Sequence, residues 1–185
     1  MIRPWNAPMS DASLALAQRI GAVVPVITTP RLTLRAPRIT DFAAWFAIVG
    51  GRRALHIGGP SDEEEAWSEF GSNVANWVLR GHGMWTICCA KGEVLGFVML
   101  GLEPGDQEHE LGYLLCDTAE GQGYATEAAG AVRDHALGVL LVPSLVSYVA
   151  AANHRSAAVA LRLGAVRDGV LDGCDIWRHH PKEGA

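Results

Sequence analysis

The order of apolar and polar residues divides the chain into segments of strand and helix character. Residues 31–35, Arg-Leu-Thr-Leu-Arg, alternate between polar and apolar side chains, the pattern of a strand with one buried face. Further strands are predicted over residues 84–90, 94–101, 108–116, 145–151, 165–171 and 174–180. The turn Lys91-Gly92-Glu93 separates the second and third of these seven segments.

Helical spacing of apolar residues appears between the predicted strands. Phe42, Trp45 and Val49 recur at helical intervals after Thr40, which we expect to cap that helix. Ser61 and Glu64 form a capping-box pattern at the start of a second helix, with acidic residues in its first turn. Two more helices are predicted over residues 122–140 and 154–163. The resulting order predicts an α/β arrangement on one mixed sheet.

Length and composition favour one globular domain. The chain has 185 residues, of which 49% are apolar and 19% charged, enough for a core and too few charges for disorder. The net charge is −5 and no Lys/Arg-rich run occurs, which argues against a nucleic-acid partner. Residues 1–27, with a short helix after Ser10, are expected to be an extension, and residues 28–185 a single domain.

The remaining sequence features point to a cytoplasmic protein without a metal. No apolar run approaches the ~20 residues of a membrane span, and the first residues do not have the order of a secretory signal. The four cysteines show no CxxC spacing, so we expect reduced thiols. His179 and His180 are adjacent near the end, and we interpret them as solvent-facing side chains.

The most informative stretch for chemistry covers residues 120–127, Glu-Gly-Gln-Gly-Tyr-Ala-Thr-Glu, between a predicted strand and a predicted helix. Its glycines let the backbone approach a ligand closely. The unpaired N–H groups and dipole of a first helical turn suit a pyrophosphate. No Gly-Lys-Ser/Thr of a Walker-A loop follows, and the third glycine of a Rossmann fingerprint is absent. Taken alone, a plain turn is an equal alternative.

The stretch resembles motif A of the GNAT acetyltransferases, Gln/Arg-x-x-Gly-x-Gly/Ala, which falls here on residues 120–125. Glu120 departs from the Gln or Arg of that pattern. Residues 153–156, Asn-His-Arg-Ser, followed by Leu-Gly-Ala at 163–165, resemble the family's Asn-x-x-Ser…Leu-Gly-Phe segment. Matches in the same order from residue 29 to residue 179 resemble the RimJ/RimL-like branch and cover most of the chain.

The resemblance implies a GNAT fold, with a mixed, mostly antiparallel sheet of seven strands, about four flanking helices and splayed central strands. It implies acetyl-CoA as cosubstrate, no metal, and direct transfer of the acetyl group to a primary amine. It also implies that the coenzyme contacts the glycine loop, the strand before it and the Asn-x-x-Ser segment, that is, Gln122, Gly123, Tyr124, Ala125, Thr126, Leu114, Leu115, Cys116, Asn153 and Ser156. Asn153 has a second interpretation as a helix cap, and both roles are compatible.

Two residues are candidates for catalysis. Strand alternation places Glu110, Gly112, Leu114 and Cys116 on one face, where a carboxylate can take the proton of the amine directly or through water. A structural carboxylate is an equal alternative for Glu110. The family position of Ser156 suggests an acid or a positioning hydroxyl near the sulfur. No tyrosine follows Tyr148, which removes the late tyrosine that many GNAT enzymes use as the acid.

The amine acceptor is expected to be a protein N-terminus or a small-molecule amine. The resemblance places His56 and Trp85 at the acceptor pocket, and Asp175 in the last hairpin is a further candidate. The alternatives are a core position for Trp85 and a solvated turn for Asp175. A catalytically weak acyl-CoA-binding module that acts through a partner is the competing function, because Glu120 and the missing tyrosine depart from the family. A homodimer is compatible with the sequence.

Overall fold

The computed structural model describes residues 7–51, 54 and 59–181. Within them the α-helices are α1 (Asp11–Gly21), α2 (Phe42–Val49), α3 (Glu63–Arg80), α4 (Tyr124–Gly138) and α5 (His154–Arg162). The strands are β1 (Ile27–Thr28), β2 (Leu32–Arg35), β3 (Met84–Cys89), β4 (Val94–Gly101), β5 (His109–Leu115), β6 (Leu145–Ala150), β7 (Val166–Leu171) and β8 (Cys174–Arg178). Two short 3-10 helices, η2 (Ile39–Asp41) and η4 (Asp117–Ala119), precede α2 and α4.

The strands form one eight-stranded sheet in the order β1-β2-β3-β4-β5-β6-β8-β7. Neighbouring strands are antiparallel except β5 and β6, which α4 connects as a parallel crossover. The structure confirms the mixed, mostly antiparallel sheet and adds one strand to the seven predicted. The additional strand, β1, pairs with β2 through two residues and is too short to show an alternating pattern.

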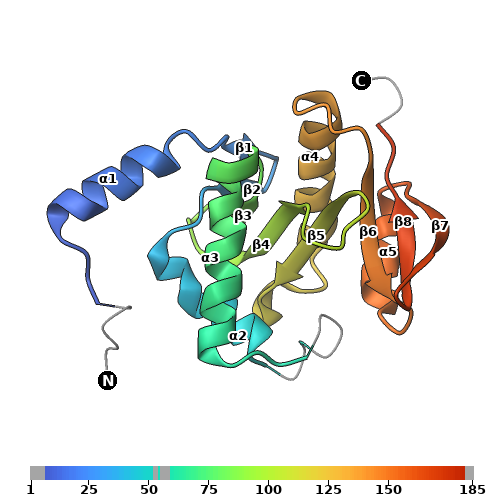
Figure 1. Ribbon diagram of the computed structural model, residues 1–185, viewed down its shortest axis with the longest axis horizontal. Helices are drawn as coiled ribbons and strands as arrows, with labels where there is room; N and C mark the ends of the chain where they lie inside the picture. The colour runs from blue at the N-terminus through green and yellow to red at the C-terminus, as the bar shows by residue number, and fades with distance from the viewer. Residues whose placement is uncertain (1–6, 52–53, 55–58, 182–185) are drawn as a thin grey trace.

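Helices cover both faces of the sheet, as Figure 1 shows, and each face has its own hydrophobic cluster. On one face α2 and α3 pack on β4, where the Trp45 and Phe97 rings meet edge to face at 5.3 Å. On the other face α4 buries Ala129 and Val132 against the sheet. Each large side chain that is fully buried contributes about 1.5–3 kcal/mol to folding, so α2, α3 and α4 are firmly anchored.

The first turn of α3 corrects one sequence prediction. Asp62, rather than Ser61, caps the helix, and its carboxylate accepts the N–H groups of Glu64 and Glu65, each at 2.9 Å. Glu65 returns a bond to the Asp62 N–H at 3.0 Å, so the capping box lies one residue later than predicted. A carboxylate gains more than a hydroxyl from the positive end of the helix dipole.

The N-terminal helix α1 extends away from the sheet, at the left in Figure 1. Ser10 caps it as predicted, since its hydroxyl oxygen accepts the Ser13 N–H at 3.2 Å. None of its residues is buried. Leu16 and Ile20 expose 55% and 52% of their surface, so α1 adds little to the core.

The strands β5 and β6 separate soon after they pair. They are in register only at His109↔Leu145 and Glu110↔Val146. Beyond these positions β5 stays paired with β4, and β6 stays paired with β8. The facing edges of β5 and β6 therefore diverge, and the prediction of splayed central strands is confirmed.

Candidate active site

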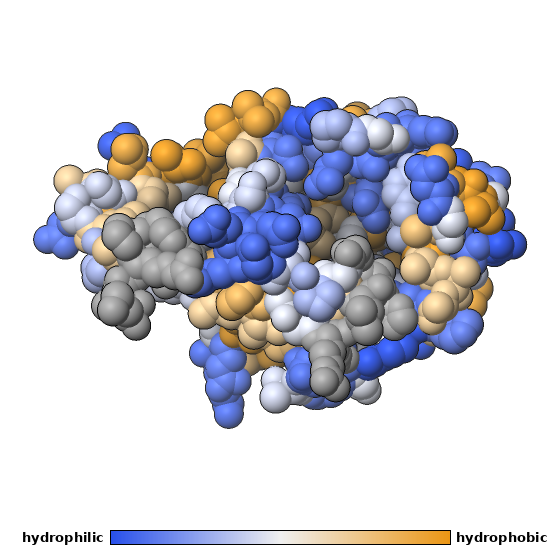
Figure 2. All heavy atoms as spheres, turned by 60° about the horizontal axis from the view of Figure 1, so that its bottom comes forward, coloured by the Kyte–Doolittle hydropathy of each residue, from blue (hydrophilic) through white to orange (hydrophobic). Residues whose placement is uncertain are grey.

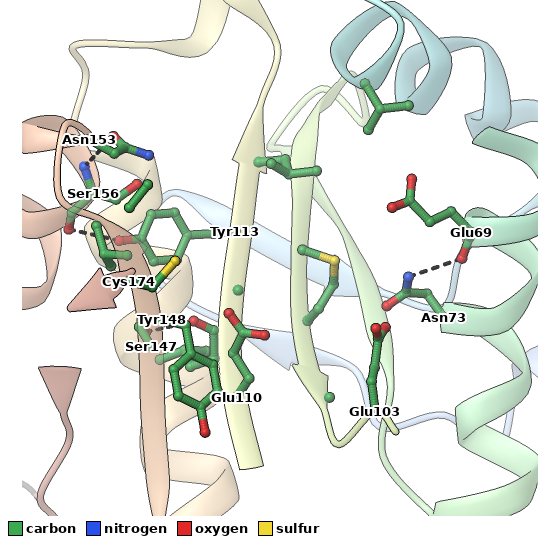
Figure 3. Close-up of a pocket in the computed structure, with 18 of the residues that line it drawn as sticks. Glu69, Asn73, Glu103, Glu110, Tyr113, Ser147, Tyr148, Asn153, Ser156 and Cys174 are labelled. Carbon is green, nitrogen blue, oxygen red and sulfur yellow. Dashed lines mark hydrogen bonds between the residues drawn. The ribbon is translucent and has the colours of Figure 1, made fainter. Parts of the chain in front are cut away.

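A cavity of about 360 Å³ lies where β5 and β6 diverge. One wall comes from β5, β6 and the start of α5, and the other comes from α2, α3 and the end of β4 (Figure 3). The face shown in Figure 2 is hollowed near its centre and bordered by hydrophilic residues. Among the described residues that line the cavity are Glu69, Glu103 and Glu110, and none is a lysine, arginine or histidine.

Glu110 lies at the base of the opening and is the last residue of β5 that pairs with β6. Burial raises the pKa of its carboxyl group to about 7, and the negative charge of Asp106 adds to this rise. A backbone hydrogen bond from Tyr148 acts in the opposite direction. A carboxyl group with a pKa near neutral exchanges protons readily at physiological pH, as the proposed base must.

The predicted alternation of side chains along β5 is confirmed. Leu114 packs with the cluster under α2 and α3, whereas Leu111, Tyr113 and Leu115 pack with the cluster under α4. Glu110 therefore shares its face of the sheet with Leu114 and points toward the side of α2 and α3.

The direction of the backbone N–H groups of β5 corrects the expected contacts to the coenzyme. The Cys116 N–H donates to the Leu95 carbonyl at 2.9 Å and is thus used in pairing with β4. Because N–H direction alternates along an antiparallel ladder, the Leu114 N–H also points to β4. The N–H groups that face the opening are those of Tyr113 and Leu115.

Tyr113 crosses the opening and closes one end of the cavity (Figure 3). Its hydroxyl donates to the Ser156 carbonyl at 3.0 Å, and burial raises its pKa to about 12. Asn153 caps α5, since its side-chain oxygen accepts the Ser156 N–H at 3.1 Å. The structure thus brings Asn153 and Ser156 to the same cavity as Glu110.

The glycine loop precedes α4 and has the geometry of an anion cradle. Gly121 and Gly123 adopt φ of 72° and 79°, a left-handed conformation that disfavours side chains. Gly123 is the N-cap of α4 and supplies no side-chain cap, so the helix start presents backbone N–H groups. These groups belong to the predicted loop residues Gly123, Tyr124, Ala125 and Thr126, and Gln122 lies one residue before them.

Three arginines surround this loop, and sequence analysis missed all of them. Arg31 donates to the Gln122 carbonyl at 2.9 Å, pairs with Glu127 at 2.6 Å and lies 4.7 Å from the Tyr124 ring centre. Arg155 forms an ion pair with Glu120 at 2.5 Å, and Arg162 donates to the Thr126 hydroxyl at 3.3 Å. The Asn-His-Arg-Ser segment contained Arg155, but only the fold brings it beside Glu120.

Two of the three candidates for acceptor binding are not brought to the cavity. Trp85 is fully buried in the core, where its indole N–H donates to the Pro25 carbonyl at 2.8 Å. Asp175 forms an ion pair with Arg167 on the β7–β8 hairpin at 2.5 Å. His56 lies outside the described residues.

Other residues of the site carried no sequence signal. Ser147 and Cys174 line the cavity from β6 and β8. His179, which we expected to face solvent, is only 4% exposed, and its Nε2 lies 2.9 Å from the Ser147 hydroxyl. His179 directly follows β8. Its backbone N–H donates to the Leu145 carbonyl of β6 at 2.9 Å, which holds the residue against the sheet.

Among residues 7–51, 54 and 59–181, no group of three or more His, Cys, Asp or Glu side chains is placed to hold a metal ion. None of the helices that the structure describes combines the length and apolar character needed to cross a bilayer.

Comparison with known proteins gives a consistent result. A family model for an acetyltransferase (GNAT) domain matches residues 31–166. The chain is 40% identical to an acetyltransferase from Agrobacterium tumefaciens strain C58, with a TM-score of 0.81 over 85% of this chain and 95% of that one.

Two structures of lower identity share the fold. RimL, a ribosomal L7/L12 α-N-protein acetyltransferase in complex with coenzyme A, is 22% identical, with a TM-score of 0.69 over 85% of this chain and 98% of that chain. A spermidine N-acetyltransferase from Vibrio cholerae, in complex with CoA and spermine, is 17% identical, with a TM-score of 0.65 over 81% of this chain and 94% of that chain.

Proposed function

The chain belongs to the GNAT acetyltransferase family, and from that premise we propose that it moves an acetyl group from acetyl-CoA directly to a primary amine. The observation that carries the proposal is Glu110, a half-buried carboxyl group with a pKa of about 7 in the cavity between β5 and β6. The glycine loop before α4 supplies the second requirement, because its N–H groups suit the diphosphate of the cosubstrate.

In the proposed reaction Glu110 takes a proton from the ammonium form of the acceptor. The free amine attacks the thioester carbonyl carbon, the C–S bond breaks, and the coenzyme leaves as a thiolate, while the nitrogen releases its second proton to solvent to give the neutral amide. Glu110 then returns its proton to the thiolate, whose pKa is higher, since free thiols have a pKa of about 8.5. Tyr113 is unsuited to donate that proton, because burial raises its pKa to about 12.

The backbone and α5 assist this transfer. The Tyr113 and Leu115 N–H groups face the opening and are our assigned donors to the pantetheine and to the developing oxyanion. Asn153 and Ser156, which lie at the same opening, are assigned to the thiol end of the pantetheine. Ser156 acts as a positioning hydroxyl, since an unactivated hydroxyl is a poor acid.

The pKa of Glu110 favours an α-amino acceptor. Such a group has a pKa of about 7.7–8.0 and an alkylamine about 10.4, so proton transfer to a base with a pKa of about 7 costs ~1 kcal/mol or ~5 kcal/mol respectively. The cavity also carries Glu69 and Glu103, which repel the carboxylate of a free amino acid. A peptide N-terminus meets both conditions, and we propose it as the preferred acceptor.

The test is calorimetry with acetyl-CoA, followed by free-thiol release with peptides, free amino acids and polyamines. We expect micromolar binding and the fastest thiol release with peptides. Glu110→Gln should bind acetyl-CoA normally and lose at least ~100-fold in kcat, as expected for a general base. Binding without release from any acceptor would support the acyl-CoA-binding module instead, and absence of binding would refute the assignment of the loop.

A further inference from the structure

The pairing of β5 and β6 ends at the cavity and leaves backbone groups that a longer ladder would join. The paired residues end with Glu110 opposite Val146. One step further, Leu111 would stand opposite Ser147. In a parallel ladder a carbonyl accepts the N–H of the residue after its opposite partner, so the Leu111 carbonyl would accept the Tyr148 N–H.

Side chains interact with the Leu111 carbonyl and the Tyr148 N–H, the two backbone groups of this missing bond. The Ser147 hydroxyl donates to the Leu111 carbonyl at 2.6 Å. The Tyr148 N–H faces the same opening, and its interaction with the carboxyl group of Glu110 lowers the pKa of that group. The Ser147 hydroxyl thus satisfies the Leu111 carbonyl where the strands separate, and the Tyr148 N–H is left to act on Glu110.

The direction of the hydrogen bonds around Ser147 fixes the tautomer of His179. The hydroxyl has one proton, which it donates to the Leu111 carbonyl. The contact at 2.9 Å between Ser147 and His179 therefore requires the Nε2–H of His179 as donor. The Nδ1 atom of this imidazole is buried, with no hydrogen-bond partner among the described residues. Burial lowers the His179 pKa to about 4, which keeps the ring neutral.

We propose that Ser147, oriented by His179, is a positioning residue that ends the pairing of β5 and β6 and thereby leaves the Tyr148 N–H free to orient the Glu110 carboxylate. We call the bonded series His179, Ser147 and Leu111 carbonyl the Ser147 bridge. This proposal rests on the proposed function, in which Glu110 is the base. It is independent of the identity of the amine.

The Ser147 bridge links the hydrogen-bond partner of the Leu111 carbonyl to that of the Tyr148 N–H. Without the hydroxyl, the Leu111 carbonyl is a buried acceptor without a partner, which is unfavourable. The nearest backbone donor on β6 is the Tyr148 N–H. If this N–H moves to Leu111, β5 and β6 pair one step further, and Glu110 loses the bond that favours its charged form.

The other groups near Glu110 do not change with Ser147. The charges of Glu103 and Asp106 from the β4–β5 connection raise its pKa. The titratable groups that line the same cavity from other elements are Glu69 from α3, Tyr113 from β5, the Tyr148 hydroxyl from β6 and Cys174 from β8. A change in the titration of Glu110 on substitution of Ser147 is therefore specific to the Ser147 bridge.

The experiment is the pH dependence of kcat/KM for the wild type and Ser147→Ala. The wild type should lose activity below a pH of about 7, where Glu110 becomes protonated. In Ser147→Ala this limb should move to higher pH by about 0.5–1 unit, because a hydrogen bond to the charged form is lost. At high pH, where Glu110 is ionised in both proteins, the two rates should converge.

Substitutions of His179 give a matched pair. In His179→Gln the amide nitrogen stands near the position of Nε2 and can still donate to Ser147, so the profile should stay close to that of the wild type. His179→Leu removes the donor and should shift the limb in the same direction as Ser147→Ala. If Ser147→Ala does not fold, the two His179 variants still test the proposal, because they change the hydrogen bond to Ser147 and leave the serine itself in place.

NMR can follow the interaction between Tyr148 and Glu110 without a measurement of activity. In the wild type the Tyr148 amide resonance should titrate with Glu110, and this response should weaken in Ser147→Ala. An unshifted limb with a uniform loss of activity, an unchanged Tyr148 titration, or a His179 protonated at Nδ1 would overturn the proposal. Full activity of Glu110→Gln would instead refute Glu110 as the base, and the Tyr148 titration would still decide whether the Ser147 bridge orients its carboxylate.

Discussion

Glu110→Gln should inactivate the enzyme and stabilise its fold at the same time. In the folded protein the Glu110 pKa is about 7, against an ordinary value of 4.5. A difference of about 2.5 units at 1.36 kcal/mol per unit corresponds to ~3 kcal/mol. Because the folded state holds its proton more tightly, this stability is lost as pH rises from about 4.5 to 7 and stays lost above. Glutamine cannot ionise and avoids the loss.

The assay is thermal or urea unfolding of both proteins at pH 4.5 and pH 8. At pH 8 the variant should be more stable by up to ~3 kcal/mol, or ~6–12 °C in Tm for a chain of this size. At pH 4.5 the two should agree closely. A stability difference that does not change with pH would refute a raised Glu110 pKa and, with it, the main support for its role as base.

Glu108 provides a matched control of opposite sign, two residues earlier in the chain. Its ion pair with Arg178, at 2.6 Å, lowers the pKa of its carboxyl group. That stability is present above the ordinary pKa and is lost as pH falls through the lower folded value. Glu108→Gln should therefore destabilise the protein at pH 8, and this effect should shrink in acid.

Three further predictions concern the loop and the core. Arg31→Met should raise KM for acetyl-CoA about 10-fold and leave KM for acetyl-pantetheine unchanged, because Arg31 holds the loop that we assign to the diphosphate. The control is Arg167→Met, which is remote on the β7–β8 hairpin. An equal rise in KM for both thioesters would contradict this role of Arg31. Gly123→Ala should weaken acetyl-CoA binding and cost ~1–2 kcal/mol in stability, since φ is 79° there; unchanged calorimetry and Tm would argue against it. Trp85→Phe should lower stability by about 1–3 kcal/mol through the orphaned Pro25 carbonyl; a changed acceptor KM at unchanged stability would instead support a pocket role.

The sequence was sufficient for the features that depend on local pattern. Alternation along residues 108–116 placed Glu110 and Leu114 on one face, and the glycine pattern located the loop before α4. The direction of the N–H groups of β5 required the register with β4, so the Cys116 N–H was misassigned.

Features that join distant segments could not be predicted from pattern. The pairing of Arg155 with Glu120 joins residues that are 35 apart in sequence. The burial of His179 depends on its bond to β6, and a pair of histidines near a terminus usually faces solvent. The role of Ser147 is visible only where two strands separate.

The short seam between β5 and β6 also has a consequence for how the molecule unfolds. On one side of it β6, β8 and β7 pair with one another and, with α5, enclose a separate cluster around Val149 and Trp177. On the other side lie the two larger clusters, one of which also includes Leu145 at the start of β6. Two residue pairs of the sheet join these parts, so we expect the C-terminal part to open at a lower free energy than global unfolding. A ligand that fills the seam stabilises the closed state by RT ln(1 + [L]/Kd), so amide-exchange protection of β6 and β8 would rise with the concentration of acetyl-CoA.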